Sequence, residues 1–308
     1  MIHLIAIVGP TAAGKTALSI ELAERIGRAG GAAEIVSADS RQIYRTMDIG
    51  TAKATAEERA RVPHHLIDVV DPDEVLTLAE YQARAYRAIA EIAARGRVPL
   101  LVGGTGQYVA AVLEGWRIPE VAPQEALRAE LGAWAEARGS EALHARLAEI
   151  DPAAAAKLDH RNVRRVIRAL EVCLTTGRPI SELQGKDPPP FRVTKIGVTR
   201  PRPELYERID RRVDAMIDAG LVDEVRGLVA RGYGWELPAM TGLGYRQIGQ
   251  FLSGEVGLDE AIRLIKQGTR RFVQQQYNWF RVADAGIAWV EPGAGVADEL
   301  RVKIERDA

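Results

Sequence analysis

Short apolar runs rich in Val, Ile and Leu recur along the chain, and segments with helical periodicity separate several of them. Runs of this length bounded by turn residues predict buried β-strands. They cover residues 2–8, 34–37, 66–70, 98–102, 195–199 and 287–290. The helical segments between them cover residues 15–26, 78–95 and 205–220. This alternation predicts an α/β fold in which helices cover both faces of a mostly parallel sheet.

The alternation stops between residues 119 and 190, where the sequence has almost wholly helical character. The predicted helices there cover residues 126–138, 141–150 and 162–176. The segment ends at the helix-breaking sequence DPPP, residues 187–190. We therefore predict an all-helical insertion domain at 119–190 within an α/β core formed by 1–118 and 191–308.

Composition is that of a globular protein: 308 residues, 47% hydrophobic and 27% charged. No apolar stretch approaches the roughly 20 residues that cross a bilayer, so we expect a cytoplasmic protein without membrane contact. The single cysteine, Cys173, excludes an intramolecular disulfide and a cysteine-based zinc cluster. A net charge of −1 argues against an obvious nucleic-acid binder. However, only seven of the 41 cationic residues are Lys, and the arginines that make up the rest are concentrated in parts of the sequence.

Residues 9–16, GPTAAGKT, match the phosphate-binding pattern G-x-x-x-x-G-K-[ST] between a predicted strand and a predicted helix. Main-chain N–H groups and the helix N-terminus would bind a diphosphate or triphosphate, and the Thr16 hydroxyl would bind Mg²⁺. The predicted anion site comprises Gly9, Thr11, Ala12, Ala13, Gly14, Lys15 and Thr16. P-loop NTPases hold Mg²⁺ with an aspartate at the end of a later core strand, and no carboxylate ends the predicted strand at 98–102. The phosphate loop alone therefore does not identify ATP as the ligand. A metal-binding role stays open for Asp39 and Asp68, which follow other predicted strands.

Asp39 leaves the second predicted strand at its carboxyl end, the edge at which open α/β sheets bind ligands. A carboxylate there could accept a proton from a nucleophile, and Arg41 and Gln42 could bind a base edge. On spacing alone, capping of the next helix explains Asp39 equally well, and both interpretations remain open.

Two stretches concentrate arginine without acidic residues. Residues 161–168 carry four Arg at helical spacing, and residues 263–281 combine five cations with four aromatic residues. Phosphate contacts and stacking surfaces of this kind suit a single-stranded RNA loop, whereas a solvated basic face is the simpler alternative.

An ordered set of motifs extends this picture over most of the chain. Besides GPTAAGKT it contains SADSRQIYRTMDIGTAK, HHLID, LVGGTGQY, RALEV, LYERIDRRVDAMIDAGLVDEV, AMTGLGYRQ and WFR, ending near residue 281. In this order the motifs resemble the tRNA dimethylallyltransferase family, also called the tRNA isopentenyltransferases, of bacterial type. The resemblance implies a monomeric transferase that moves a dimethylallyl group from dimethylallyl diphosphate, with Mg²⁺, to the N6 amine of the adenosine 3′-adjacent to the anticodon, in the tRNA anticodon stem-loop.

The resemblance also implies roles for individual residues. Asp39 would be the general base, Thr105 would lie near the reacting centre, and Arg208 would join Lys15 and Thr16 on the diphosphate. The implied tRNA contacts, together with our own assignment of Arg270 and Arg271, are Asp39, Ser40, Arg41, Gln42, Thr105, Arg128, Arg164, Arg165, Val166, Ile167, Arg168, Arg270 and Arg271.

The chain departs from the family pattern at three notable positions. Ala13 replaces a serine whose hydroxyl could reach the diphosphate, which predicts weaker donor binding. Gln274 and Gln275 replace a lysine and an arginine, which predicts weaker and less salt-dependent tRNA binding through that helix. Two alternative activities stay open: a dimethylallyltransferase acting on free adenylate, and a P-loop kinase of small molecules.

Overall fold

The computed structural model describes residues 1–306 and divides into two compact units. The larger unit is built from Met1–Leu113 and the chain from Pro189 onward, and the smaller unit is Glu114–Pro188. The expected boundaries, 119 and 190, each lie a few residues further along the chain. Two short strands explain the first difference, because β5 (Trp116–Arg117) pairs antiparallel with β6 (Gly185–Lys186) inside the smaller unit.

A six-stranded sheet forms the centre of the larger unit, with the strand order β3-β2-β4-β1-β7-β8. Every neighbouring pair is parallel, which confirms the predicted α/β fold. The central strands β1, β2 and β4 are buried almost throughout, as expected when helices cover both faces of a sheet. The strands are β1 (Ile2–Val8), β2 (Ala33–Ala38), β3 (His64–His65), β4 (Val98–Gly103), β7 (Phe191–Val198) and β8 (Ala288–Val290).

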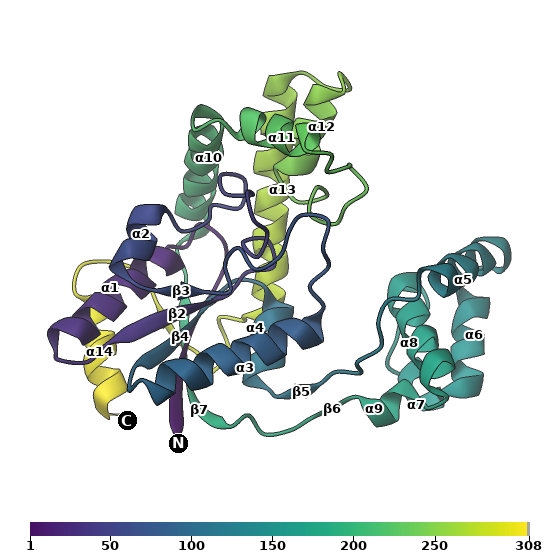
Figure 1. Ribbon diagram of the computed structural model, residues 1–308, viewed down its shortest axis with the longest axis horizontal. Helices are drawn as coiled ribbons and strands as arrows, with labels where there is room; N and C mark the ends of the chain where they lie inside the picture. The colour runs from purple at the N-terminus through teal and green to yellow at the C-terminus, as the bar shows by residue number, and fades with distance from the viewer. Residues whose placement is uncertain (307–308) are drawn as a thin grey trace. The chain divides into compact units, whose positions relative to one another are not determined.

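Helices lie on both sides of this sheet: α1 and α14 pack together on one side, and α3 and α4 on the other (Figure 1). A second group, α10 to α13, packs together within the same unit. None of the helices in residues 1–306 is both long and apolar enough to span a bilayer. The helices of the larger unit are α1 (Lys15–Arg28), α2 (Ala56–Arg61), α3 (Leu78–Ala94), α4 (Gly106–Leu113), α10 (Arg202–Asp218), α11 (Leu221–Ala230), α12 (Tyr245–Leu252), α13 (Leu258–Trp279) and α14 (Val296–Arg306).

One predicted strand is wrong. The apolar run at 66–70 forms no strand; the sheet takes only the two preceding histidines as β3. Leu66 and Asp68 have positive φ angles of 61° and 56°, which breaks an extended conformation. Only Val70 keeps a bridge, a parallel one to Tyr44. The segment therefore packs against the chain that follows β2 instead of lengthening the sheet.

The smaller unit is helical and has its own apolar core, including Leu131, Leu143, Leu147, Val166 and Leu170. Each of these five side chains is fully buried. A separate core of this kind is the mark of a domain. The helices are α5 (Glu125–Arg138), α6 (Ser140–Ile150), α7 (Pro152–Ala155), α8 (Val163–Thr176) and α9 (Ile180–Leu183).

Candidate active site

The loop between β1 and α1 has the geometry of an anion cradle. Gly9 has a φ of 137°, and a Cβ there would collide with the main-chain oxygen of Val198 on the neighbouring strand β7. Ala12 and Gly14 also have positive φ angles, 63° and 107°, and Gly14 is the N-cap of α1. Positive φ angles in a loop just before a helix N-terminus can turn main-chain N–H groups toward an anion, which the helix dipole also favours.

Three cations bind the carbonyl oxygens of this loop. Lys15 Nζ donates to Pro10 O at 2.8 Å, Arg208 Nε to Ala12 O at 2.8 Å, and Arg200 Nε to Ala13 O at 3.0 Å. Ala13 itself is fully buried and does not line the cavity, so the serine it replaces is not missed there as a cavity-lining group. The cations therefore gather where the loop would hold phosphate oxygens.

Arg212 adds a fourth cation that the sequence analysis missed. It lies one helical turn after Arg208 on α10 and donates to the Thr11 hydroxyl at 3.2 Å. Burial lowers the pKa of Lys15 to about 8; the charge of Asp39 acts to raise it, and Arg212 lowers it further. Burial also lowers the pKa of Arg212, against an opposing effect of Asp39. The i, i+4 spacing after Arg208 was the available signal.

Gln276, on α13, ties the phosphate loop to the end of β4. Its Oε1 accepts from Thr11 N at 2.8 Å, and its Nε2 donates to Gly104 O at 2.9 Å. The side chain is almost completely buried, and a Cβ on Gly104 would collide with it. The two preceding glutamines, Gln274 and Gln275, which depart from the family pattern, are exposed, whereas Gln276 was not predicted as a site residue.

Asp39 follows β2 at its carboxyl end and faces this cation group. Its Oδ1 accepts from Arg41 N at 2.8 Å and Gln42 N at 3.4 Å, a turn-capping arrangement that leaves Oδ2 available. Thr105, after β4, accepts at Oγ1 from Ser40 N at 3.0 Å. Asp39 caps a turn, and the next helix begins only at Ala56, so the helix-capping interpretation is wrong. Asp39 also lines the cavity described below, and its role as a base stays a prediction.

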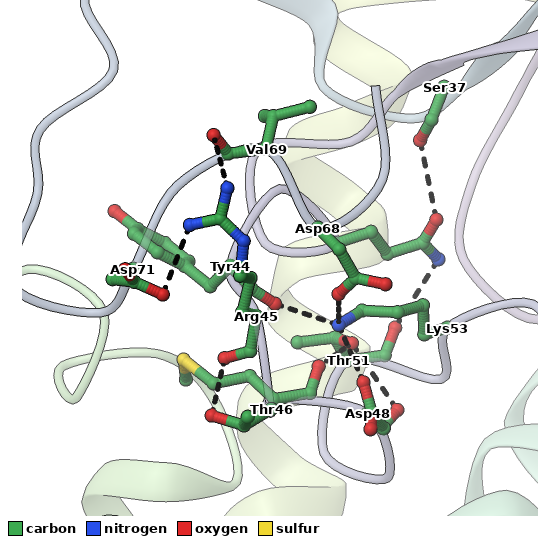
Figure 2. Close-up of polar contacts among 12 residues, drawn as sticks. Ser37, Tyr44, Arg45, Thr46, Asp48, Thr51, Lys53, Asp68, Val69 and Asp71 are labelled. Carbon is green, nitrogen blue, oxygen red and sulfur yellow. Dashed lines mark hydrogen bonds and ion pairs between the residues drawn. The ribbon is translucent and has the colours of Figure 1, made fainter. Parts of the chain in front are cut away.

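Gln42 and Arg41 are held by the surrounding chain. The Gln42 amide accepts from Ser37 Oγ at 3.3 Å and donates to Ala52 O at 3.2 Å, and Arg41 Nη1 donates to Pro238 O at 2.7 Å (Figure 2 shows the Ser37 contact). The orientation of the Gln42 amide is therefore set by the segments on either side of it.

One cavity of about 560 Å³ lies within the larger unit, and the phosphate loop, Asp39 and the α10 arginines line it. Thr105 and Arg41, which were also expected at the site, are not among its lining residues. This volume suits a small-molecule ligand of several functional groups. The polar side chains that matter for its chemistry are Lys15, Thr16, Asp39, Gln42, Arg208 and Arg212. A cavity with cations and a hydroxyl on one side and a carboxylate on the other can bind a polyphosphate and accept a proton beside it.

The arginines of the smaller unit divide into two kinds. Arg128 and Arg168 both bind Glu171, whose side chain is fully buried; Arg128 Nε lies 2.8 Å from Glu171 Oε1. Arg164 and Arg165 are exposed on α8. Of the expected tRNA contacts on this helix, Val166 is a fully buried core residue and Ile167 packs against that core.

The second arginine cluster is largely neutralised by acids from elsewhere. Lys266 and Arg270, on α13, form ion pairs with Asp214 and Asp210 of α10, and Arg263 pairs with Glu260. Among the proposed RNA contacts on α13, Arg271 is exposed, whereas Arg270 is half-buried. The absence of acids within this stretch of sequence thus overstated its local positive charge.

The chain is similar to known proteins over most of its length. The model of the IPP transferase family matches residues 42–283. A tRNA dimethylallyltransferase of Roseiflexus sp. (strain RS-1) is 60% identical over 281 residues, covering 91% of this chain and 90% of that protein. The tRNA isopentenylpyrophosphate transferase from Bacillus halodurans superposes with a TM-score of 0.72 at 42% identity, covering 99% of this chain and 98% of that one.

A eukaryotic dimethylallyltransferase acting on tRNA superposes more closely, with a TM-score of 0.81 at 25% identity, over 98% of this chain and 78% of that one. The match therefore extends over both units of the chain and not only over the phosphate loop. With the family model matching most of its length, this chain belongs to the IPP transferase family.

Proposed function

We propose that this chain transfers the dimethylallyl group of dimethylallyl diphosphate to the N6 amine of the adenosine 3′-adjacent to the anticodon in tRNA. The observation that carries the proposal is the cavity in which the phosphate loop and the α10 arginines face Asp39. The names of the similar proteins support the same donor and acceptor classes. A kinase would use the same loop for ATP, whereas the similar proteins named above are called dimethylallyl- or isopentenylpyrophosphate transferases.

In the proposed reaction a bond forms between the adenosine nitrogen and the first carbon of the prenyl group, and the bond from that carbon to the diphosphate oxygen breaks. Asp39 takes the proton that the amine loses. Lys15, Arg208 and Arg212, with the loop N–H groups, stabilise the charge that the leaving diphosphate gains. Thr105, bonded to Ser40 N, keeps the Asp39 turn against the end of β4.

The donor set also fits a magnesium ion. Thr16 lines the cavity beside Lys15, and the described residues contain no group of three or more His, Cys, Asp or Glu side chains that could cage a metal. Mg²⁺ commonly takes one or two protein oxygens and completes its shell with phosphate oxygens and water. Bound through Thr16 and the diphosphate, Mg²⁺ would neutralise charge on the leaving group.

We further propose that the tRNA contacts the exposed arginines 164 and 165 of α8, and Arg271 of α13. The glutamines 274 and 275 are exposed and carry no positive charge that could bind a phosphate, so apart from Arg271 this part of α13 should add little to the salt dependence of binding.

One transfer experiment tests the proposed function. The chain is incubated with dimethylallyl diphosphate labelled in the prenyl group and Mg²⁺, with either unmodified tRNA or AMP as acceptor. We expect label in tRNA only. Label in AMP would instead support transfer to free adenylate, and label in neither acceptor, together with turnover of ATP, would support a kinase.

The pKa of Lys15 gives a second expected result. Because burial lowers this pKa to about 8, the ammonium is charged below that pH and loses its proton above it. The kcat/KM for dimethylallyl diphosphate, which reports groups of the free enzyme, should therefore fall as the pH rises through about 8. Lys15→Arg, which stays charged, should remove this decline; an unchanged decline in that variant would assign it to another group.

A further inference from the structure

The chain between residues 43 and 53 is irregular and strained, yet it borders the proposed acceptor side of the site. Thr46 and Ala52 have positive φ angles of 62° and 48°, and Leu66 and Asp68, on the segment packed beside it, have 61° and 56°. Residues with a Cβ seldom adopt this conformation unless their surroundings impose it. Tertiary contacts must therefore hold residues 43–53 and the segment around residues 66–68 in these conformations.

Lys53 is the side chain that joins them. Its Nζ donates to Tyr44 O at 2.7 Å, to Asp48 Oδ1 at 2.6 Å and to Asp68 Oδ1 at 2.6 Å (Figure 2). An ammonium has three N–H donors, and here each has an acceptor on a different part of the chain. The Lys53 side chain is 1% exposed, so water cannot replace these partners without opening the structure.

The same segments determine the position of Gln42. Its side-chain amide donates to Ala52 O, the residue before Lys53, and its main-chain oxygen accepts from Asp68 N at 3.2 Å. Lys53 N also closes the turn by donating to Asp48 O at 3.0 Å. These two partners of Gln42, Ala52 and Asp68, are thus adjacent to Lys53 or bonded to it, while Ser37 holds the other end of the amide.

We propose that Lys53 is a positioning residue for the acceptor side of the site. Its buried ammonium fixes the turn that orients Gln42, and Gln42 in turn helps to place the amine of the acceptor adenosine beside Asp39. This proposal rests on the proposed function. Lys53 does not line the cavity, and the phosphate loop has its own supports in Gln276 and the α10 arginines. Loss of Lys53 should therefore affect the acceptor and spare the donor.

The test replaces Lys53 with methionine, which keeps the length of the side chain and removes its charge. We expect kcat/KM for tRNA to fall about 10- to 100-fold, because small displacements of positioning groups have effects of this size. The KM for dimethylallyl diphosphate should stay within about twofold of the wild-type value, since the donor contacts are elsewhere. Hydrogen exchange of the amides of residues 43–53 and 68–70 should become faster, and that of residues 9–16 should not.

Arg59→Ala is the matched control, because Arg59 binds the other oxygen of Asp68, at 2.9 Å, and is not one of the groups bonded to the Lys53 ammonium. It should leave both kinetic constants near wild type. Asp48→Asn weakens the contact between Lys53 and residue 48. Because the Asp48 side chain is 61% exposed, this change carries less risk to folding, and it should give a smaller loss in kcat/KM for tRNA, about 3- to 10-fold.

A folded Lys53→Met protein with unchanged kcat/KM for tRNA would overturn the proposal. So would an equal rise in the donor KM, which would indicate general loosening of the site. If the wild-type chain transfers no prenyl group to tRNA, the proposed function fails first, and this is seen in the wild-type assay before any variant is compared.

Discussion

Asp39→Asn should transfer the dimethylallyl group to tRNA about 10²- to 10⁴-fold more slowly than the wild type, the usual contribution of a general base. Asparagine keeps an oxygen that can accept from Arg41 N and Gln42 N, so the turn after β2 is preserved. What it loses is the capacity to take a proton from the adenosine amine. Single-turnover transfer from labelled dimethylallyl diphosphate measures the effect on the chemical step.

Binding of the donor should be preserved in this variant, because the loop N–H groups, Lys15 and the α10 arginines remain. Removal of the Asp39 charge takes away an influence that raises the pKa of Lys15, so affinity is best compared below pH 7. Asp71→Asn is the control: this carboxylate pairs with Arg45 at 3.1 Å, on an exposed part of the molecule. Transfer by Asp39→Asn at a rate near that of the wild type would show that the base assignment is wrong.

The second large effect separates two kinds of arginine in the smaller unit. Arg164→Ala with Arg165→Ala should reduce the slope of log affinity for tRNA against log salt by about 0.7 for each phosphate group that no longer binds an arginine. Both side chains are exposed on α8, so stability should change by no more than about 0.5 kcal/mol. Affinity measured over a range of salt concentrations gives the slope.

Arg168→Ala should lower the stability of the smaller unit and leave the salt dependence of tRNA binding unchanged. It removes one partner of the fully buried Glu171 carboxylate, which keeps Arg128 and Gln124 N as partners. We expect the smaller unit to lose about 1.5–3 kcal/mol of stability, the size of one hydrogen bond to a charged group. Hydrogen exchange of the amides of α5 and α8 reports that loss locally. If Arg168→Ala instead lowers the salt slope at unchanged stability, Arg168 is an RNA contact and not a structural residue.

Local patterns predicted the parts of the fold that depend on local physics. The phosphate loop, the six-stranded parallel sheet apart from the third strand, and the helical insertion were all visible as runs, turns and periodicity. The third strand failed because hydrophobicity at 66–70 reflects packing against residues 43–45, and the positive φ angles of Leu66 and Asp68 are imposed by those tertiary contacts.

The candidate site was predicted less completely, for a related reason. Asp39 and Lys15 belong to contiguous motifs, whereas Arg212 and Gln276 reach the phosphate loop from helices about 200 residues and more further along the chain. The charge of a cluster is likewise a tertiary property: Arg270 has no acid near it in sequence but lies against Asp210 of another helix. Contacts between residues this far apart in sequence become visible only in the folded structure.

The short antiparallel pair of β5 and β6 has a consequence for the modularity of the chain. Trp116 is paired with Lys186, so the point where the chain enters the helical unit lies beside the point where it leaves. Excising the unit would leave a gap that a few residues can close at little cost in loop entropy. With an apolar core of its own, the excised unit has what it needs to fold alone, as an insertion that could be gained or lost without rebuilding the sheet.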